Sequence, residues 1–305
     1  MSKELPAARS CPVCHAGTAQ ATVFLEENLD PAKLSSLSFA SRKTPEYMCH
    51  RLVRCTECDL VYADQPPSAD ELAIAYHQAG YDSQEEADDA ASAYIRAAQP
   101  VLARLRQRGG ALEIGTGTGV FLDHLQREGF QALLGVEPSP AAIHAAPPSR
   151  RGWIRQGVFR ESDFEPSSFD LVCCFMTLEH VRDPQTIAQA ALRLLRPGGA
   201  FIAVTHDYRS WVNRLLGKRS PIIDIEHMQL FSAASVRQLF ERAGFADVSV
   251  QSFKNRYPMA YWVRLAPLPA PLKSTADRLL RSVGLGRAKL GVNVGNLFVA
   301  GFKNG

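Results

Sequence analysis

Three glycines stand at alternating positions in the stretch "LEIGTGTGV", at Gly115, Gly117 and Gly119. The apolar residues before them suit a buried strand, and glycine lets the backbone turn sharply and a ligand approach it closely. The dinucleotide fingerprint G-x-G-x-x-G does not match, because Val120 holds the place of its third glycine. The spacing therefore predicts a strand-to-helix turn that opens a binding site for another kind of ligand.

Four cysteines form two C-x-x-C pairs in the N-terminal quarter of the chain. Each pair brings two thiolates onto one tight turn, and two pairs complete the tetrahedral shell that structural zinc prefers. Because four sulfurs leave no open position for water, we expect the metal to be structural and to stabilise a small lobe. A redox pair and unconnected thiols are the alternatives. The expected zinc ligands are Cys11, Cys14, Cys55 and Cys58, with His15, Cys49 and His50 as substitutes.

Strand-like and helix-like segments alternate between "ALEIG" and "NLFVAGF", over residues 111–302. This alternation predicts parallel β-α units with helices on both faces of one sheet. Asp183 and Ser232 predict the N-caps of two helices in this run, and Gly244 predicts the left-handed end of the second. The fold class is therefore expected to be α/β.

Two stretches interrupt the alternation, at about 206–231 and about 255–295. Insertions after the carboxyl ends of strands are where an open α/β sheet builds its acceptor pocket, so the first stretch is expected to matter most. We expect an N-terminal zinc-binding lobe and linker over 1–75, and the α/β domain over 76–305.

Composition limits the class of protein. The chain has 305 residues, of which 46% are hydrophobic, so it can bury a substantial core. No secretory signal and no membrane-length apolar run is present, which favours a cytoplasmic location. Seven cysteines, an odd number, suit metal in a reducing compartment better than a disulfide framework. The net charge of +3 is too small to argue for nucleic acid.

Charge is concentrated near the C-terminus. Residues 254–305 hold nine basic residues against one acid, a net charge of +8. A solvated basic face is one interpretation. An anionic partner is the other, and it would be a phosphorylated substrate, a membrane surface or RNA.

Four motifs, in order, resemble those of class I S-adenosylmethionine-dependent methyltransferases: "LEIGTGTGVFLDHL", "GVEPS", "SFDLVCCFMTLEHV" and "LRPGGAFIAV". The likeness covers about 94–303 and implies a Rossmann-like seven-stranded sheet. It implies that the glycine turn wraps the methionine end of the cofactor and that Glu137 accepts hydrogen bonds from both ribose hydroxyls. The implied cofactor-binding residues are Glu113, Gly115, Thr116, Gly117, Gly119, Glu137, Pro138, Val158, Phe159 and Met176.

Methyl transfer from a sulfonium needs positioning and, at most, one base that removes the acceptor's proton. His180, in "TLEHV", and His227, in "DIEHMQLFS", are the candidate bases, and Glu226 is placed to orient or charge His227. A structural hydrogen-bonding role is the alternative for each histidine. Weaker candidates are Glu179, and His206 with Asp207, whereas Cys173 and Cys174 are expected to be core residues.

The cysteine pairs together with this core resemble bacterial methyltransferases of sugar and natural-product pathways, including deoxysugar C-methyltransferases. In the C-methyltransferases a tyrosine stands where this chain has Asp224, and a long C-terminal domain follows that is missing here. We therefore expect methylation of a hydroxyl on a sugar, nucleotide-sugar or natural-product intermediate. The alternatives are C-methylation of a keto-deoxysugar, methylation of RNA and a non-catalytic scaffold.

Overall fold

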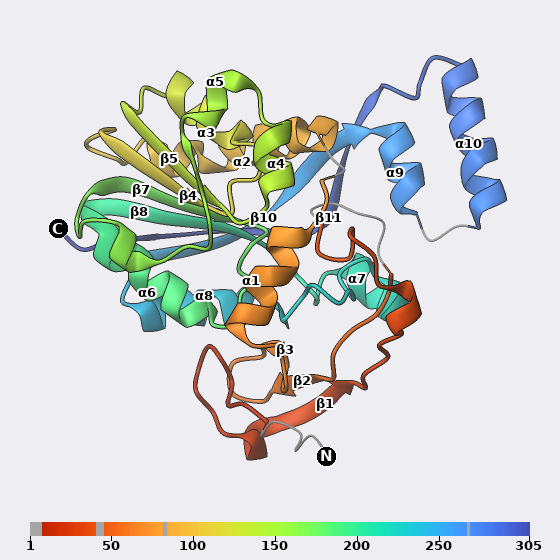
Figure 1. Cartoon of the computed structure of the whole chain (residues 1–305), viewed down its shortest axis with the longest axis horizontal. Coiled ribbons are helices and arrows are strands. Elements are labelled where there is room, and N and C mark those ends of the chain that lie inside the picture. Colours follow the sequence, from red (N-terminus) through yellow and green to blue (C-terminus); the bar gives the residue numbers. More distant parts are fainter. Residues whose placement is uncertain (1–7, 41–45, 82–83, 267–268) are drawn as a thin grey trace.

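The computed structural model of the chain describes residues 8–40, 46–81, 84–266 and 269–305. Pro267 and Leu268, within the second expected insertion, lie outside this part. Figure 1 shows a large twisted sheet with helices above and below it, a small sheet beneath it and a helical projection to one side. None of the described helices is both long enough and apolar enough to cross a membrane.

The large sheet has seven strands in the order β10-β11-β8-β7-β4-β5-β6. Only β11 runs against the others. Strands β4 and β7 are buried along their whole length, and apart from Glu113 and Asp170 their residues are apolar or glycine, as is typical of strands that are covered on both faces. The expected α/β fold class and seven-stranded sheet are confirmed. The strands are β4 (Gly110–Ile114), β5 (Ala132–Glu137), β6 (Ile154–Gln156), β7 (Phe169–Phe175), β8 (Leu195–His206), β10 (Ala246–Pro258) and β11 (Lys289–Phe302).

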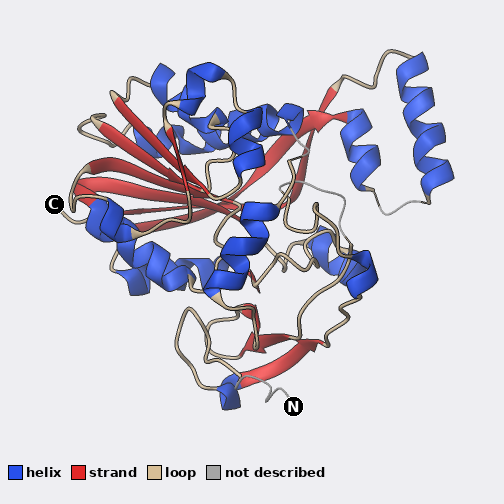
Figure 2. Ribbon diagram, viewed as in Figure 1, coloured by secondary structure: helices blue, strands red, loops and turns tan. Residues whose placement is uncertain are grey.

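Helices cover both faces of this sheet (Figure 2). Alternate residues of each central strand point into two separate cores, so that Cys173 packs with helices α2 and α3 while Cys174 packs with α6 and α8. Both cysteines are fully buried, as expected for core residues. The helices are α1 (Ala69–Gln78), α2 (Gln84–Leu102), α3 (Val120–Arg127), α4 (Pro140–Ala145), α5 (Pro148–Arg151), α6 (Pro184–Leu194) and α8 (Ala233–Ala243).

The small sheet combines two distant parts of the chain. Its antiparallel strands are β1 (Ala21–Leu25), β2 (Leu52–Cys55), β3 (Val61–Ala63) and β9 (Gln229–Leu230). Strand β9 comes from the insertion 206–231, which also holds helix α7 (Trp211–Leu216) and ends against the N-terminal residues. Among the described residues, short 3-10 turns lie at Thr18–Gln20, Pro31–Lys33, Glu161–Asp163 and Gly217–Arg219.

The second interruption is shorter than the sequence indicates. Strands β10 and β11 continue to Pro258 and from Lys289, because their ends pair with each other beyond the body of the sheet. The connection between them holds helices α9 (Met259–Leu265) and α10 (Ala270–Ser282), which project away from the sheet in Figure 1.

Candidate active site

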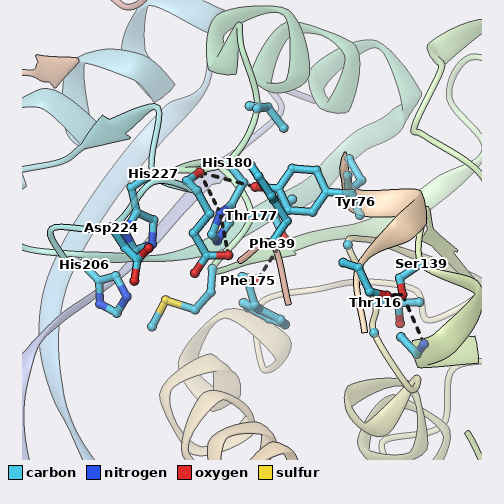
Figure 3. Close-up of a pocket in the computed structure, with 18 of the residues that line it drawn as sticks. Phe39, Tyr76, Thr116, Ser139, Phe175, Thr177, His180, His206, Asp224 and His227 are labelled. Atoms are coloured by element: carbon cyan, nitrogen blue, oxygen red, sulfur yellow. Dashed lines mark hydrogen bonds and ion pairs between the residues drawn. The ribbon is translucent and has the colours of Figure 1, made fainter. Parts of the chain in front are cut away.

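A cavity of about 1000 Å³ opens at the carboxyl ends of strands β4, β5 and β7. The glycine turn and Glu137 line one part of it, and Tyr76, His180 and His227 line another. Figure 3 shows His206, Asp224 and His227 at one end of this hollow and Thr116 and Ser139 at the other. The carboxyl ends of parallel strands are where ligands bind in open α/β sheets.

The glycine turn connects β4 to α3, and its backbone requires glycine. Gly115, Gly117 and Gly119 have φ angles of 75°, 56° and 70°, a region that other residues rarely adopt. A Cβ on Gly115 would lie 2.2 Å from Oγ1 of Thr177, whereas a Cβ on Gly117 would meet nothing within 4 Å. Gly117 therefore leaves open space at the cavity wall.

Glu137 ends strand β5 with its carboxylate turned toward the glycine turn. Its Oε2 accepts from the backbone N–H of Gly117 at 2.8 Å, and its Oε1 accepts from that of Ser139 at 2.9 Å. Burial raises the pKa of Glu137, against the lowering effect of these two bonds. Because each carboxylate oxygen has two lone pairs, both oxygens can accept a further hydrogen bond from a ligand.

Glu113 and Thr116 fix the first part of the turn. Both are buried, and the Thr116 hydroxyl donates to Oε2 of Glu113 at 2.6 Å. The Thr116 side chain also fills the space beside Gly135, where a Cβ would lie 2.5 Å from it. Glu113, Thr116 and the neighbouring Pro138 all line the cavity.

Two apolar segments expected to contact the cofactor line the same cavity as the glycine turn. Val158 and Phe159 line it from the loop after β6, and the Phe159 ring stacks on Phe164 at 5.7 Å between ring centres. Met176 lines it immediately after β7 and has a φ of 49°, which is uncommon for a residue with a side chain.

His180, Glu226 and His227 converge on the remaining part. Each offers one ligand atom within 4.8 Å of the others, and the two imidazole rings lie 4.9 Å apart between centres. Nδ1 of His180 is 3.2 Å from the Glu226 carbonyl oxygen and 3.8 Å from its Oε2. Nδ1 of His227 is 2.9 Å from the carbonyl oxygen of Ile222. A carbonyl only accepts, so Nδ1 carries the proton in both neutral rings and the lone pair is on Nε2.

Tyr76 is a lining residue that the sequence prediction did not name. Its hydroxyl donates to the Glu226 carbonyl oxygen at 3.3 Å, and its ring meets that of His180 edge-on at 5.8 Å. Burial raises the pKa of Tyr76 well above its ordinary value. The signal that could have found it is helical spacing, because Tyr76 follows the buried Leu72 by four residues on the helix that Ser68 caps.

The weaker candidates have structural contacts. Glu179 is fully buried outside the cavity lining, and its Oε1 accepts from the backbone N–H of His206 at 2.7 Å. Burial raises the pKa of Glu179 to about 7. His206 lines the cavity with Nδ1 3.0 Å from Oδ1 of Asn296, and burial lowers its pKa. Asp207, like Glu179, is outside the lining.

The four cysteines of the two C-x-x-C pairs form one group. Their Sγ atoms all lie within 4.8 Å of one another, with Cys11 3.4 Å from Cys58 and Cys14 3.5 Å from Cys55. A tetrahedral zinc shell, with bonds of about 2.3 Å, holds its sulfurs about 3.8 Å apart, so these distances fit the ion. The substitutes considered from the sequence, His15, Cys49 and His50, do not belong to the group.

A short series of contacts connects the cysteine group with the segment that carries Glu226 and His227. Asp59 follows Cys58, accepts from the Tyr208 hydroxyl at 2.7 Å and pairs with the Arg209 guanidinium. Strand β3 then pairs with β9, and the backbone N–H of Ala63 donates to the Met228 carbonyl at 2.9 Å. The lobe that holds the cysteines therefore contacts the segment carrying Glu226 and His227 directly.

Comparison with known proteins gives several matches. A ubiquinone biosynthesis O-methyltransferase of Pectobacterium carotovorum is 30% identical over 113 residues, which is 35% of this chain and 47% of that protein. This chain thus spans about half the length of the curated relatives it matches. Among solved structures, a methyltransferase of Thermotoga maritima described as a possible histamine N-methyltransferase has a TM-score of 0.49 and 21% identity, covering 72% of this chain and 92% of that one.

A second solved structure is phosphoethanolamine N-methyltransferase 2 of Haemonchus contortus with S-adenosyl-L-methionine, with a TM-score of 0.43 and 18% identity, covering 72% of this chain and 57% of that one. The model of the family described as "Methyltransferase domain" matches residues 68–250. This match extends from the Ser68 cap to strand β10 and includes the glycine turn, Glu137 and both histidines. The chain therefore belongs to the methyltransferase domain family.

Proposed function

We propose that this protein transfers the methyl group of S-adenosylmethionine to a hydroxyl of a small molecule. The observation that carries this proposal is that a glycine turn with a buried carboxylate and a pair of imidazoles line different parts of the same cavity. The family match and the curated relatives named as O-methyltransferases support it.

The residues of the cofactor part fit S-adenosylmethionine. Glu137 would hold the ribose, since its two oxygens retain acceptor capacity toward a diol. The glycine turn would hold the methionine end where Gly117 leaves open space, with Val158, Phe159 and Met176 against the adenine. When bound, the cofactor supplies an electrophilic methyl group.

His180 is the base in this proposal. Neutral His180 would receive the acceptor's proton on Nε2 and become an imidazolium. The Glu226 carboxylate, 3.8 Å from its Nδ1, would stabilise that positive charge. His227 packs beside His180 and is oriented by the Ile222 carbonyl, so it would position the acceptor or share the proton.

The lining of the acceptor part narrows the substrate class. Aromatic and aliphatic side chains from four separate segments face the cavity, namely Phe39, Trp211, Ile222, Tyr257 and Tyr261. Such walls bury a ring or an apolar skeleton, while the few polar groups fix its orientation. Among the acceptors considered from the sequence, these apolar walls favour a hydroxylated natural-product intermediate over an unmodified sugar.

Zinc is the second part of the proposal. The Cys11, Cys14, Cys55 and Cys58 thiolates would form a closed shell that stabilises the lobe over 1–75, next to the α/β domain over 76–305. The ion would have no role in the methyl transfer itself. Its contribution would be to hold the lobe against the segment carrying Glu226 and His227.

Native mass spectrometry together with calorimetry tests this function. We expect one zinc ion per chain, binding of S-adenosylmethionine or its demethylated product, and loss of nucleoside affinity in Glu137→Ala. A protein that carries zinc but does not bind S-adenosylmethionine would contradict the proposed activity and favour a scaffold. Binding of S-adenosylmethionine together with strongly salt-dependent binding of RNA would indicate that the methyl acceptor is RNA and not a small molecule.

A further inference from the structure

Helices α9 and α10 form a hairpin that projects from the body of the protein (Figure 1). Helix α10 packs mainly against α9. Two ion pairs attach the base of the hairpin to helix α2, one between Arg264 and Glu86 at 3.4 Å and one between Lys289 and Asp89. The hairpin is thus anchored at its base while most of α10 faces solvent.

An apolar stripe runs along the exposed side of α10. Leu272, Ala276, Leu279 and Val283 recur at intervals of four, three and four residues, which places them on one side of the helix. The exposed fractions of Leu272, Leu279 and Val283 are 55%, 64% and 57%. Leu285 and Leu290, just beyond the helix, are also about half exposed, at 46% and 50%. A continuous exposed apolar surface of this kind marks an interaction site.

The stripe borders an apolar groove between the two helices. This groove has a volume of about 360 Å³, and Leu279 and Leu290 contribute to its wall. Trp262 and Ala266 line both the groove and the large cavity, so the two hollows are neighbours. A surface that engages the stripe therefore lies next to the acceptor part of the cavity.

Basic residues surround the stripe. Residues 259–290 contain six basic side chains and one acid, a net charge of +5. At 3.6 residues per turn, Lys273 lies about 90° to one side of the stripe and Arg278 about 130° to the other, and Arg287 follows in the loop beyond it. Long basic side chains beside an exposed apolar stripe can reach anionic headgroups while the apolar residues enter the acyl boundary.

We propose that the α9–α10 hairpin docks this protein on an anionic membrane surface, with Leu272, Leu279 and Val283 inserted at the headgroup boundary. Charge decides between this occupant and a second copy of the chain. Each hairpin keeps a net charge of +3 after the two acids of α2 that pair with it are counted, so two hairpins would repel each other. Nucleic acid would use the basic residues but would leave the leucine stripe uncovered. Docking would bring the acceptor cavity to the lipid, and only this last consequence rests on the proposed function.

Vesicle co-sedimentation tests the docking without any methyl transfer. The full chain is mixed with vesicles of phosphatidylcholine alone, or of phosphatidylcholine with phosphatidylglycerol. We expect the wild type to sediment with the anionic vesicles and much less with the neutral ones. The double variant Leu279→Asp with Val283→Asp should bind the anionic vesicles at least about tenfold more weakly, because two apolar side chains are lost from the inserted surface.

Two further variants separate the contributions. Val23→Asp replaces a half-exposed residue of β1, in the N-terminal sheet, and should bind vesicles as the wild type does. Lys273→Glu with Arg278→Glu should lose the preference for anionic vesicles while leaving the stripe intact. Thermal melting by circular dichroism checks that each variant is folded.

Three results would overturn the proposal. One is a wild type that fails to bind either kind of vesicle, and another is a Leu279→Asp, Val283→Asp variant that binds as well as the wild type. The third is a dimer in lipid-free sedimentation velocity that this double variant dissociates, because the stripe would then be an interface between two copies.

Discussion

The two parts of the large cavity are assembled in different ways. The part proposed to hold the cofactor is built from turns at the ends of neighbouring strands, within residues 113–176, and hydrogen bonds join its glycine turn to the carboxylates of Glu113 and Glu137. The acceptor part combines Tyr76 of α1, His180 after β7, and Glu226 with His227 from the insertion. The contact between the Tyr76 hydroxyl and Glu226 joins residues 150 positions apart in the chain.

This difference predicts different sensitivities. The proposed cofactor part is supported by the buried strands of the large sheet. A substitution outside this sheet should therefore leave the cofactor part intact. The acceptor part depends on the N-terminal lobe through Asp59 and the pairing of β3 with β9. A perturbation of the lobe should therefore affect the acceptor and spare the cofactor.

The largest effect is expected for His180→Ala. Loss of a general base lowers turnover by about 10²- to 10⁴-fold, whereas affinity for S-adenosylmethionine should stay close to that of the wild type. Steady-state kinetics and calorimetry measure the two quantities. His144→Ala, an exposed histidine on α4 outside the cavity lining, is the matched control. Full activity of His180→Ala would transfer the role of base to His227 or remove it.

Cys55→Ser should separate the two parts of the cavity most clearly. We expect loss of zinc by atomic absorption, a lower melting temperature and a large loss of turnover, because the lobe would no longer support Glu226 and His227. Affinity for S-adenosylmethionine should be retained. Cys49→Ala, a buried cysteine outside the group of four, should keep its zinc. Equal losses of turnover and cofactor affinity in Cys55→Ser would show that both parts of the cavity depend on the N-terminal lobe.

Glu137→Ala should have the opposite pattern, because it should weaken the binding of S-adenosylmethionine. Hydrogen bonds to a charged group contribute about 1.5–3 kcal/mol, so the dissociation constant should rise by roughly 10- to 150-fold. Glu137→Gln, which keeps the shape of the side chain, should have a smaller effect. Calorimetry gives both dissociation constants. An unchanged affinity in Glu137→Ala would contradict the proposal that Glu137 binds the ribose.

Glu179→Gln should change stability in a pH-dependent manner and leave cofactor affinity alone. Burial raises the pKa of Glu179 to about 7, from an ordinary value of 4.5. Between these values the unfolded chain has released the proton that the folded chain retains, so wild-type stability falls as pH rises. The variant lacks this titration, and above pH 7 it should be more stable by up to on the order of 3 kcal/mol.

Urea unfolding of both proteins at several pH values measures this advantage. The difference in the free energy of unfolding should shrink as the pH falls toward 4.5. A difference that does not vary with pH would show that Glu179 is ionised in the folded protein throughout this range.

The same contrast explains what the sequence could predict. The alternating strands and helices and the glycine turn follow from local patterns, namely apolar runs, helix caps and three closely spaced glycines, whereas the number of strands is implied by the resemblance to class I methyltransferases. Strand β9 could not be predicted, because two residues show no periodicity and their partners lie in the N-terminal lobe. The role of Tyr76 depends on the same long-range assembly.

Strands β10 and β11 illustrate a second limit. Their outer ends pair only with each other, and the strand β11 pattern is interrupted by Gly291 and Gly295. Sequence patterns at these positions resemble a loop. These residues form strands because the two segments hydrogen-bond to each other, and neither segment alone indicates that pairing.

The pairing of β3 with β9 also sets an order of folding. During synthesis β3 leaves the ribosome well before residues 229–230, so the four-stranded sheet cannot close until most of the α/β sheet has been made. Until then the edge of β3 is exposed, and exposed strand edges are prone to pair with other chains. A zinc ion bound early by the four cysteines would stabilise the lobe during this interval, so zinc-starved cells should accumulate aggregated protein even though the four cysteines lie outside the large cavity.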